Sequence, residues 1–172
     1  MFKRLMSYWF RRSGWIFTGT LPKRLNKSVI VAAPHTRTRD LMVAFGVISV
    51  THFRTGILVD ERRMKGLSGL LLRMCKAVPL PADREAAKAQ LLDAYAAHRT
   101  CSFVFTPYRN GKRTELWDDL FYEIAFETGM PIVPVGLDHR NRRVKFHAYF
   151  YPSIDPKRDL GFLKRYFQSF DR

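Results

Sequence analysis

The sequence predicts a single-domain α/β fold, with a mostly parallel or mixed central sheet flanked by helices. Three observations support this prediction. Short apolar runs of strand character alternate along the chain with segments of helical periodicity, which is the order expected when helices connect parallel strands. The length of 172 residues fits one domain. A hydrophobic content of 47% is enough for a packed core.

The predicted strands are short apolar runs bounded by glycine, proline or polar residues. They lie at 29–33, 56–59, 101–105, 131–137 and 144–151. Pro134 interrupts the fourth run. Because proline cannot donate a ladder hydrogen bond, that run is expected to be an edge or bulged strand.

The predicted helices carry apolar residues at helical spacing, and several have recognisable ends. They lie at 41–50, 62–75, 84–99 and 117–128, with a last helix opened by Asp155 and Pro156. Asp83 is the expected N-cap of the third of these helices, and Gly129 the expected stop of the fourth.

Residues 1–17 are predicted to form a short amphipathic helix that precedes the α/β domain, which takes up residues 18–172. Apolar and aromatic side chains recur on one face, with lysine and arginine beside them. Two placements are open for this helix. It either packs on the core or lies in a membrane interface, and the tryptophan and basic rim favour the interface.

The formal net charge of +15 requires a negatively charged partner, such as nucleic acid, anionic lipid or an acidic carrier protein. The longest apolar run has ten residues, too few to span a bilayer, and charges near the N-terminus leave no room for a signal peptide. Cys75 and Cys101 are expected to be buried thiols in a reducing cytoplasm, and no metal site is expected.

His35 and Asp40 form the most informative constellation in the chain. The histidine follows a predicted strand, and the aspartate begins the next helix, at the edge where open α/β sheets bind their ligands. A carboxylate on one imidazole nitrogen leaves the other free to accept a proton. No nucleophile elbow accompanies the pair, so the substrate is expected to supply the hydroxyl or amine that reacts.

The segment APHTRTRDLMVAF resembles the H-x-x-x-x-D block of the glycerolipid acyltransferase superfamily, whose members include lysophosphatidate acyltransferases. The later run FVFTPYRNGKRTELWDDLFYEIAFETGMPIVPVGLD resembles further blocks of the same family in the same order. The resemblance covers the whole chain, which is similar to short bacterial members of the family in its length and in the order of its blocks. It implies that His35 is the general base and that Asp40 orients it.

The resemblance also implies residues that bind substrate, but the acceptor loop departs from the family pattern. Where the family reads F-P-E-G-T-R, this chain keeps Arg109 and has Thr106 at the glutamate position, so a glycerol-phosphate acceptor is in doubt. Arg84 stands where the family has a phosphate-binding arginine, in an altered block. Arg37 and Arg39 either bind an anionic headgroup or phosphopantetheine arm, or are solvated surface charges.

What the resemblance implies is transfer of a fatty acyl group from acyl carrier protein or coenzyme A to a lysophosphatidate-like or other lyso-lipid acceptor. The enzyme would hold no bound cofactor and would lie peripherally on the anionic cytoplasmic face of the inner membrane. An alternative is a catalytically impaired paralogue that binds lipid. A nucleic-acid-binding module is disfavoured, because no nucleic-acid-binding motif is found.

Overall fold

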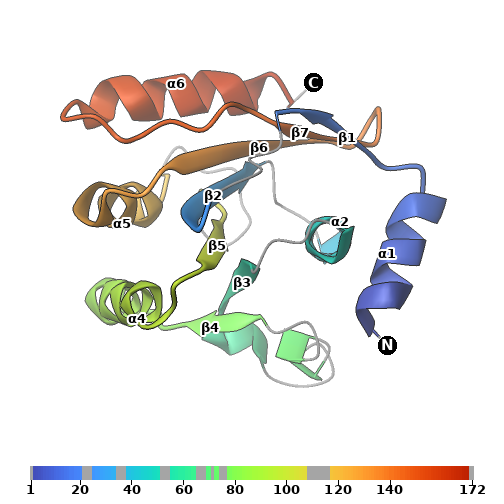
Figure 1. The fold of residues 1–172 in the computed structure, drawn as a ribbon, viewed down its shortest axis with the longest axis horizontal. Helices are drawn as coiled ribbons and strands as arrows, with labels where there is room; N and C mark the ends of the chain where they lie inside the picture. The colour runs from blue at the N-terminus through green and yellow to red at the C-terminus, as the bar shows by residue number, and fades with distance from the viewer. Residues whose placement is uncertain are drawn as a thin grey trace.

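We describe the fold from a computed structural model, in which residues 2–20, 25–33, 38–50, 55–64, 69–70, 72–73, 77–107 and 117–170 are described. For residues 2–3, 38–41, 60 and 62–63 the description covers the backbone alone. The predicted α/β class is confirmed: one mixed sheet carries helices on both of its faces (Figure 1).

The sheet has seven strands in the order β1-β7-β6-β2-β5-β3-β4. Their bounds are β1 Ile16–Gly19, β2 Lys27–Ala33, β3 Thr55–Asp60, β4 Val78–Leu80, β5 Cys101–Phe105, β6 Ile132–Asp138 and β7 Arg143–Phe146. All neighbours pair in parallel except β6 and β7, which are antiparallel. The carboxyl ends of β2 to β6 therefore share one edge of the sheet.

Strand β2 lies in the middle of the sheet, between β6 and β5. Its buried residues alternate between two cores, with Val29 and Val31 in one and Ile30 and Ala32 in the other. Burial on both faces explains why the run is apolar throughout and does not alternate with polar residues.

Pro134 does not place β6 at an edge, so that prediction is wrong. Strand β6 pairs with β2 on one side and β7 on the other. The carbonyl of Pro134 accepts a hydrogen bond from the N–H of His147, 2.9 Å away. His147 is one residue past the end of β7. The missing proline N–H therefore removes a bond only at the end of the ladder.

Helices cover both faces of the sheet. Helices α4 (Arg84–Ala97), α5 (Leu120–Thr128) and α6 (Pro156–Gln168) pack on one core, whereas α1 (Phe2–Arg12) and α2 (Thr38–Val50) pack on the other. Figure 1 shows α4 and α5 to the left of the sheet and α1 and α2 to its right, with α6 across the top. The 3₁₀ helix Glu61–Met64 follows β3.

The predicted helix ends are confirmed. The Asp83 carboxylate accepts from the N–H of Ala86 at 2.8 Å, and the Asp155 carboxylate accepts from the N–H of Arg158 at 3.1 Å. Each satisfies a donor that the first helical turn leaves unpaired. Gly129 ends α5 with a φ of 64°, a left-handed conformation that glycine adopts without strain.

Helix α1 is shorter than the predicted 1–17, because it ends at Arg12 and Ile16–Gly19 forms strand β1. Gly14 makes the change of direction with a φ of 76°. The helix packs on the core through Met6 and Phe10, which are buried, while Leu5 and Tyr8 on its other side are exposed.

Other boundaries differ from the prediction by a few residues. Helix α2 begins at Thr38 and α5 at Leu120, and β7 ends at Phe146. Within 62–75, residues 62–64 belong to the 3₁₀ helix and 69–70 and 72–73 are helical, while the rest lies outside the described residues. Strands β1 and β4 were not predicted. Cys101 is a buried free thiol as expected, and Cys75 lies outside the described residues.

Candidate functional site

The carboxyl edge of the sheet brings the ends of β2 and β5 side by side. Val31 of β2 pairs with Phe105, the last residue of β5. Along the chain, His35 is the second residue after β2, and Thr106 follows β5 directly. The H-x-x-x-x-D block and the segment that begins at Thr106 therefore follow neighbouring strands, at the edge where α/β proteins bind ligands.

Several predicted site residues lie outside what the structure describes. His35, Arg37 and Arg109 are outside the described residues. Arg39 and Asp40 belong to the first turn of α2, but their side chains are not described. The roles of these five residues remain predictions.

A cavity of about 50 Å³ lies between α2 and the sheet. Eleven of its thirteen lining residues are apolar, and the other two are threonines. The lining residues are Ile30, Ala32, Ala44, Val47, Ile48, Thr55, Ile57, Val104, Thr106, Val135, Leu137, Val144 and Phe146. An apolar lining of this kind binds hydrocarbon in preference to water.

The lining of this cavity extends along the strands from one edge of the sheet toward the other. Thr106 lies just beyond the carboxyl end of β5, whereas Thr55 begins β3 and pairs with Ser102. From Ser102 to Thr106 the strand advances four residues, or about 13 Å at the usual rise of a parallel strand. The lining therefore reaches from the edge that leads to His35 deep into the fold.

Sequence reasoning did not find this cavity, although small side chains mark it. Ala32 and Ala44 line it, where larger side chains in the surrounding apolar runs would fill the space. Gly46 lies against Phe10, since a Cβ there would come within 2.5 Å of the Phe10 ring. The two alanines among bulky residues were thus the available indication.

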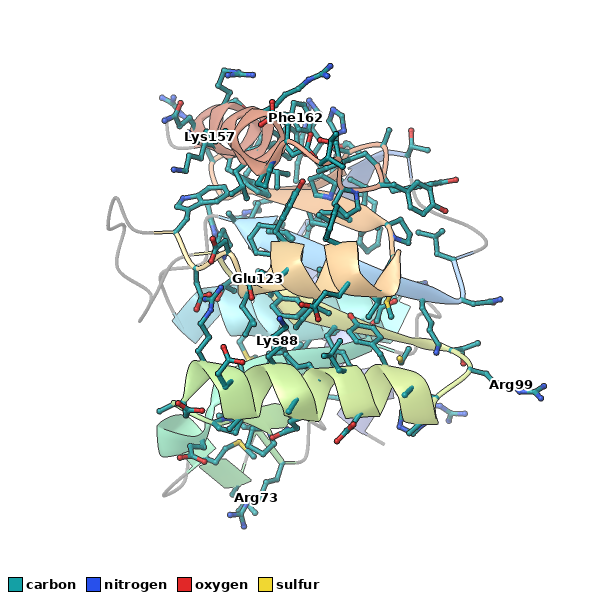
Figure 2. All side chains as sticks on the ribbon, turned by 90° about the vertical axis from the view of Figure 1, so that its left-hand side faces the viewer. Arg73, Lys88, Arg99, Glu123, Lys157 and Phe162 are labelled. Carbon is teal, nitrogen blue, oxygen red and sulfur yellow. The ribbon has the colours of Figure 1, made fainter. Side chains whose placement is uncertain are left out.

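Arg84 is held in an ion-pair cluster between α4 and the start of α5. Its guanidinium lies 3.0 Å from the Asp118 carboxylate, 2.7 Å from that of Asp119 and 2.6 Å from that of Glu123. Lys88, one turn further along α4, pairs with Glu123 at 3.7 Å and also with Glu127. Figure 2 shows Lys88 and Glu123 extending toward each other between the two helices.

This cluster stabilises the charged form of Arg84. The hydrogen bond that the Arg84 guanidinium donates to Glu123 raises the pKa of Arg84; partial desolvation opposes this shift, and the hydrogen bond to Asp119 adds to it. The N–H of Asp118 also donates a hydrogen bond to the carbonyl of Pro107. This bond joins the segment before α5 to the segment that follows β5. Arg84 therefore joins α4 to the start of α5 and the two residues before it, and a role in binding phosphate would require it to leave three carboxylates.

We expect Arg84→Ala to lower the free energy of unfolding by about 1 kcal/mol, because the pairs are partly exposed and screened by solvent. The loss should shrink at high salt. Urea denaturation at two salt concentrations measures it. Arg99→Ala is the control, since Arg99 is exposed and points outward from the far end of α4 (Figure 2). Unchanged stability with weaker binding of a phosphate-bearing acceptor would instead favour the ligand role.

Within the described part of the chain, no three histidine, cysteine or acidic side chains are grouped as metal ligands would be. The same part contains no helix with the length and apolar character needed to span a bilayer.

Comparisons with known proteins bear on the fold. Neither the family models nor the curated proteins give a match to this chain. Among solved structures, the chain is similar to the 1-acyl-sn-glycerophosphate acyltransferase of Thermotoga maritima. The two superpose with a TM-score of 0.63 at 17% sequence identity, over 97% of this chain and 77% of that one. The chain therefore has the fold of a lysophosphatidate acyltransferase.

Proposed function

We propose that the protein is an acyltransferase that moves a fatty acyl group from a thioester to a lyso-lipid acceptor. The observation that carries this proposal is the apolar cavity, which extends from the carboxyl edge of the sheet into the fold. The fold shared with an acyltransferase and the H-x-x-x-x-D block at the end of β2 support the same reaction.

In this proposal the reacting groups meet at the carboxyl edge. His35 removes the proton from the acceptor hydroxyl as the oxygen attacks the thioester carbonyl, and Asp40 holds the imidazole and stabilises its protonated form. Collapse of the tetrahedral intermediate breaks the C–S bond, and the imidazolium returns its proton to the departing thiolate. The net reaction converts one thioester and one hydroxyl into one ester and one thiol.

The acyl chain enters the cavity between α2 and the sheet, which widens from its volume of about 50 Å³ to hold the chain. The chain enters beside Thr106 and extends past Ala32 and Ala44 toward β3. Transfer of each methylene from water to such a lining is favourable by about 0.8 kcal/mol. A site of this kind binds the substrate through its chain and leaves the ester-forming group at the edge of the sheet.

The donor is proposed to be acyl carrier protein or coenzyme A, and the protein is proposed to act peripherally at the anionic cytoplasmic face of a membrane. The net charge of +15 supports an anionic surface or an acidic carrier. On α1, exposed Arg4, Arg11 and Arg12 accompany exposed Leu5 and Tyr8, the combination that binds headgroups and the acyl boundary together.

An acyl-transfer assay tests the proposal. The purified protein is incubated with labelled acyl carrier protein or acyl-coenzyme A of graded chain length and with a panel of lyso-lipids. Wild type is expected to transfer label. Ala44→Leu, which places a larger side chain in the cavity lining, should shift the preference toward shorter chains.

Ala97→Leu is the matched control, because Ala97 is exposed near the end of α4. Thermal melting of both variants checks that they are folded. An Ala44→Leu protein that keeps the wild-type chain-length preference would remove the cavity from the proposal. If wild type binds lipid but transfers no label to any acceptor, the alternative of a catalytically impaired lipid-binding paralogue is favoured.

A further inference from the structure

Thr55 is the one residue in the cavity with an unsatisfied buried hydroxyl. It begins β3 and lines the cavity at the amino end of that strand. Among the side chains that the structure describes, its Oγ1 is the only buried nitrogen or oxygen without a hydrogen-bond partner. The neighbouring hydroxyls are paired, since Ser28 and Ser102 lie 2.7 Å apart, oxygen to oxygen.

Solvent is a poor partner for this hydroxyl. A buried water molecule is held when it makes two to four hydrogen bonds, roughly three on average. The other polar side chain of the lining is Thr106, about 13 Å away along the strand direction. Among the lining side chains, a water molecule at Thr55 would find one polar group, fewer than the two to four partners that usually hold a buried water. The buried hydroxyl is therefore matched to a polar group that arrives with a ligand.

We propose that Thr55 recognises an oxygen substituent on an aliphatic chain, so that the preferred substrate is a hydroxylated or keto fatty acyl group. This inference rests on the proposed function, because it takes the cavity as the acyl site. A threonine hydroxyl both donates and accepts, so it pairs with a hydroxyl or with a carbonyl. The lining supplies apolar contacts along the remainder of the chain.

The position of Thr55 also sets where the substituent lies. The reacting thioester is placed at the carboxyl edge, beyond Thr106, and Thr55 is at the opposite end of the lining. An oxygen between the two threonines would meet apolar residues such as Ala32 and Val135 and would be buried without a partner, and an oxygen close to the thioester would be out of reach of Thr55. The preferred substituent is therefore remote from the thioester.

Binding of fatty acids by calorimetry tests the inference directly. The ligands are one unsubstituted fatty acid and a series of the same length, with the hydroxyl placed progressively from the carboxyl group to the methyl end. The whole chain is used, as wild type, Thr55→Val and Thr55→Ser. Thr100→Val is the control, since Thr100 is exposed between α4 and β5.

Wild type is expected to bind one remote-hydroxyl isomer about tenfold more tightly than the unsubstituted acid, the size of a typical net hydrogen bond. Thr55→Val should abolish this preference and bind the unsubstituted acid at least as well as wild type. Thr55→Ser and Thr100→Val should keep it. Transfer assays with the hydroxyl on the donor, or alternatively on the acceptor, then identify which chain occupies the cavity.

The outcomes separate this inference from the proposed function. If every hydroxylated isomer binds no better than the unsubstituted acid, the inference is wrong while the acyl site stands. A preference that survives in Thr55→Val also overturns the inference, because another group must then bind the oxygen. Failure of wild type to bind any fatty acid overturns both, whereas binding without any acyl transfer overturns the proposed reaction and leaves the role of Thr55 in binding.

Discussion

Replacing His35 with alanine is expected to lower the rate of acyl transfer by about 10²- to 10⁴-fold, the range typical of a general base. The free energy of unfolding should change little, since the proposed role of His35 is in proton transfer. Transfer of label from acyl carrier protein, measured at saturating donor and acceptor, gives the change in kcat. The matched control is His98→Ala, because His98 is exposed at the end of α4.

Asp40→Asn extends this test to the orienting residue. Because the two residues act as a unit, the double variant should be no slower than His35→Ala alone. Multiplying losses would mean that Asp40 acts independently of the imidazole. A His35→Ala protein as active as the His98→Ala control would remove the proposed base, and the lipid-binding alternative would then account for the cavity.

Replacing Phe10 with alanine is expected to lower the free energy of unfolding by about 3–5 kcal/mol, as for other large-to-small changes in a core. The ring is 1% exposed and stacks on Phe17, with ring centroids 5.0 Å apart. Phe10 also lies against α2 at Gly46. This is a large share of the stability of a single domain. Urea denaturation followed by tryptophan fluorescence measures the loss.

Tyr8→Ala is the matched variant, because Tyr8 is on the same helix and 67% exposed. Its stability should remain within about 0.5 kcal/mol of wild type. Its binding to vesicles of anionic lipid should weaken, since the exposed ring is proposed to enter the interface. A Phe10→Ala protein as stable as Tyr8→Ala would mean that α1 is not held on α2. Unchanged vesicle binding by Tyr8→Ala would remove that ring from the interface.

The sequence predicted an element correctly where the residues of that element alone determine its structure. Strand β5 was predicted with the correct bounds because its five residues are all buried and apolar or small. The start of α4 followed from the Asp83 cap. By contrast, Ile16 and Phe17 at the start of β1 were predicted as the end of a helix, because β1 is defined by its pairing with β7, which is far away in the sequence. Strand β4 has three residues, one of them Pro79, and forms by pairing with β3.

The same distinction holds for the candidate site, where the sequence indicated two residues but not the cavity. His35 and Asp40 stand out because their residue types, spacing and place after a strand are all local properties of the chain. The cavity is assembled from residues of β2, α2, β3, β5, β6 and β7, each of which looks like an ordinary core position in the sequence. Whether such residues close on one another or leave a space depends on distances across the sheet, which no local pattern specifies.

The central position of β2 has a consequence for how a chain enters the fold. Strand β2 is hydrogen-bonded on both sides, so the sheet forms a wall that cannot shift without breaking two ladders. Helix α2 forms the opposite wall and packs on the sheet through apolar side chains such as Val43 and Phe45. Any widening needed to admit a hydrocarbon tail therefore falls to the helix, while the strand that leads to His35 keeps its register.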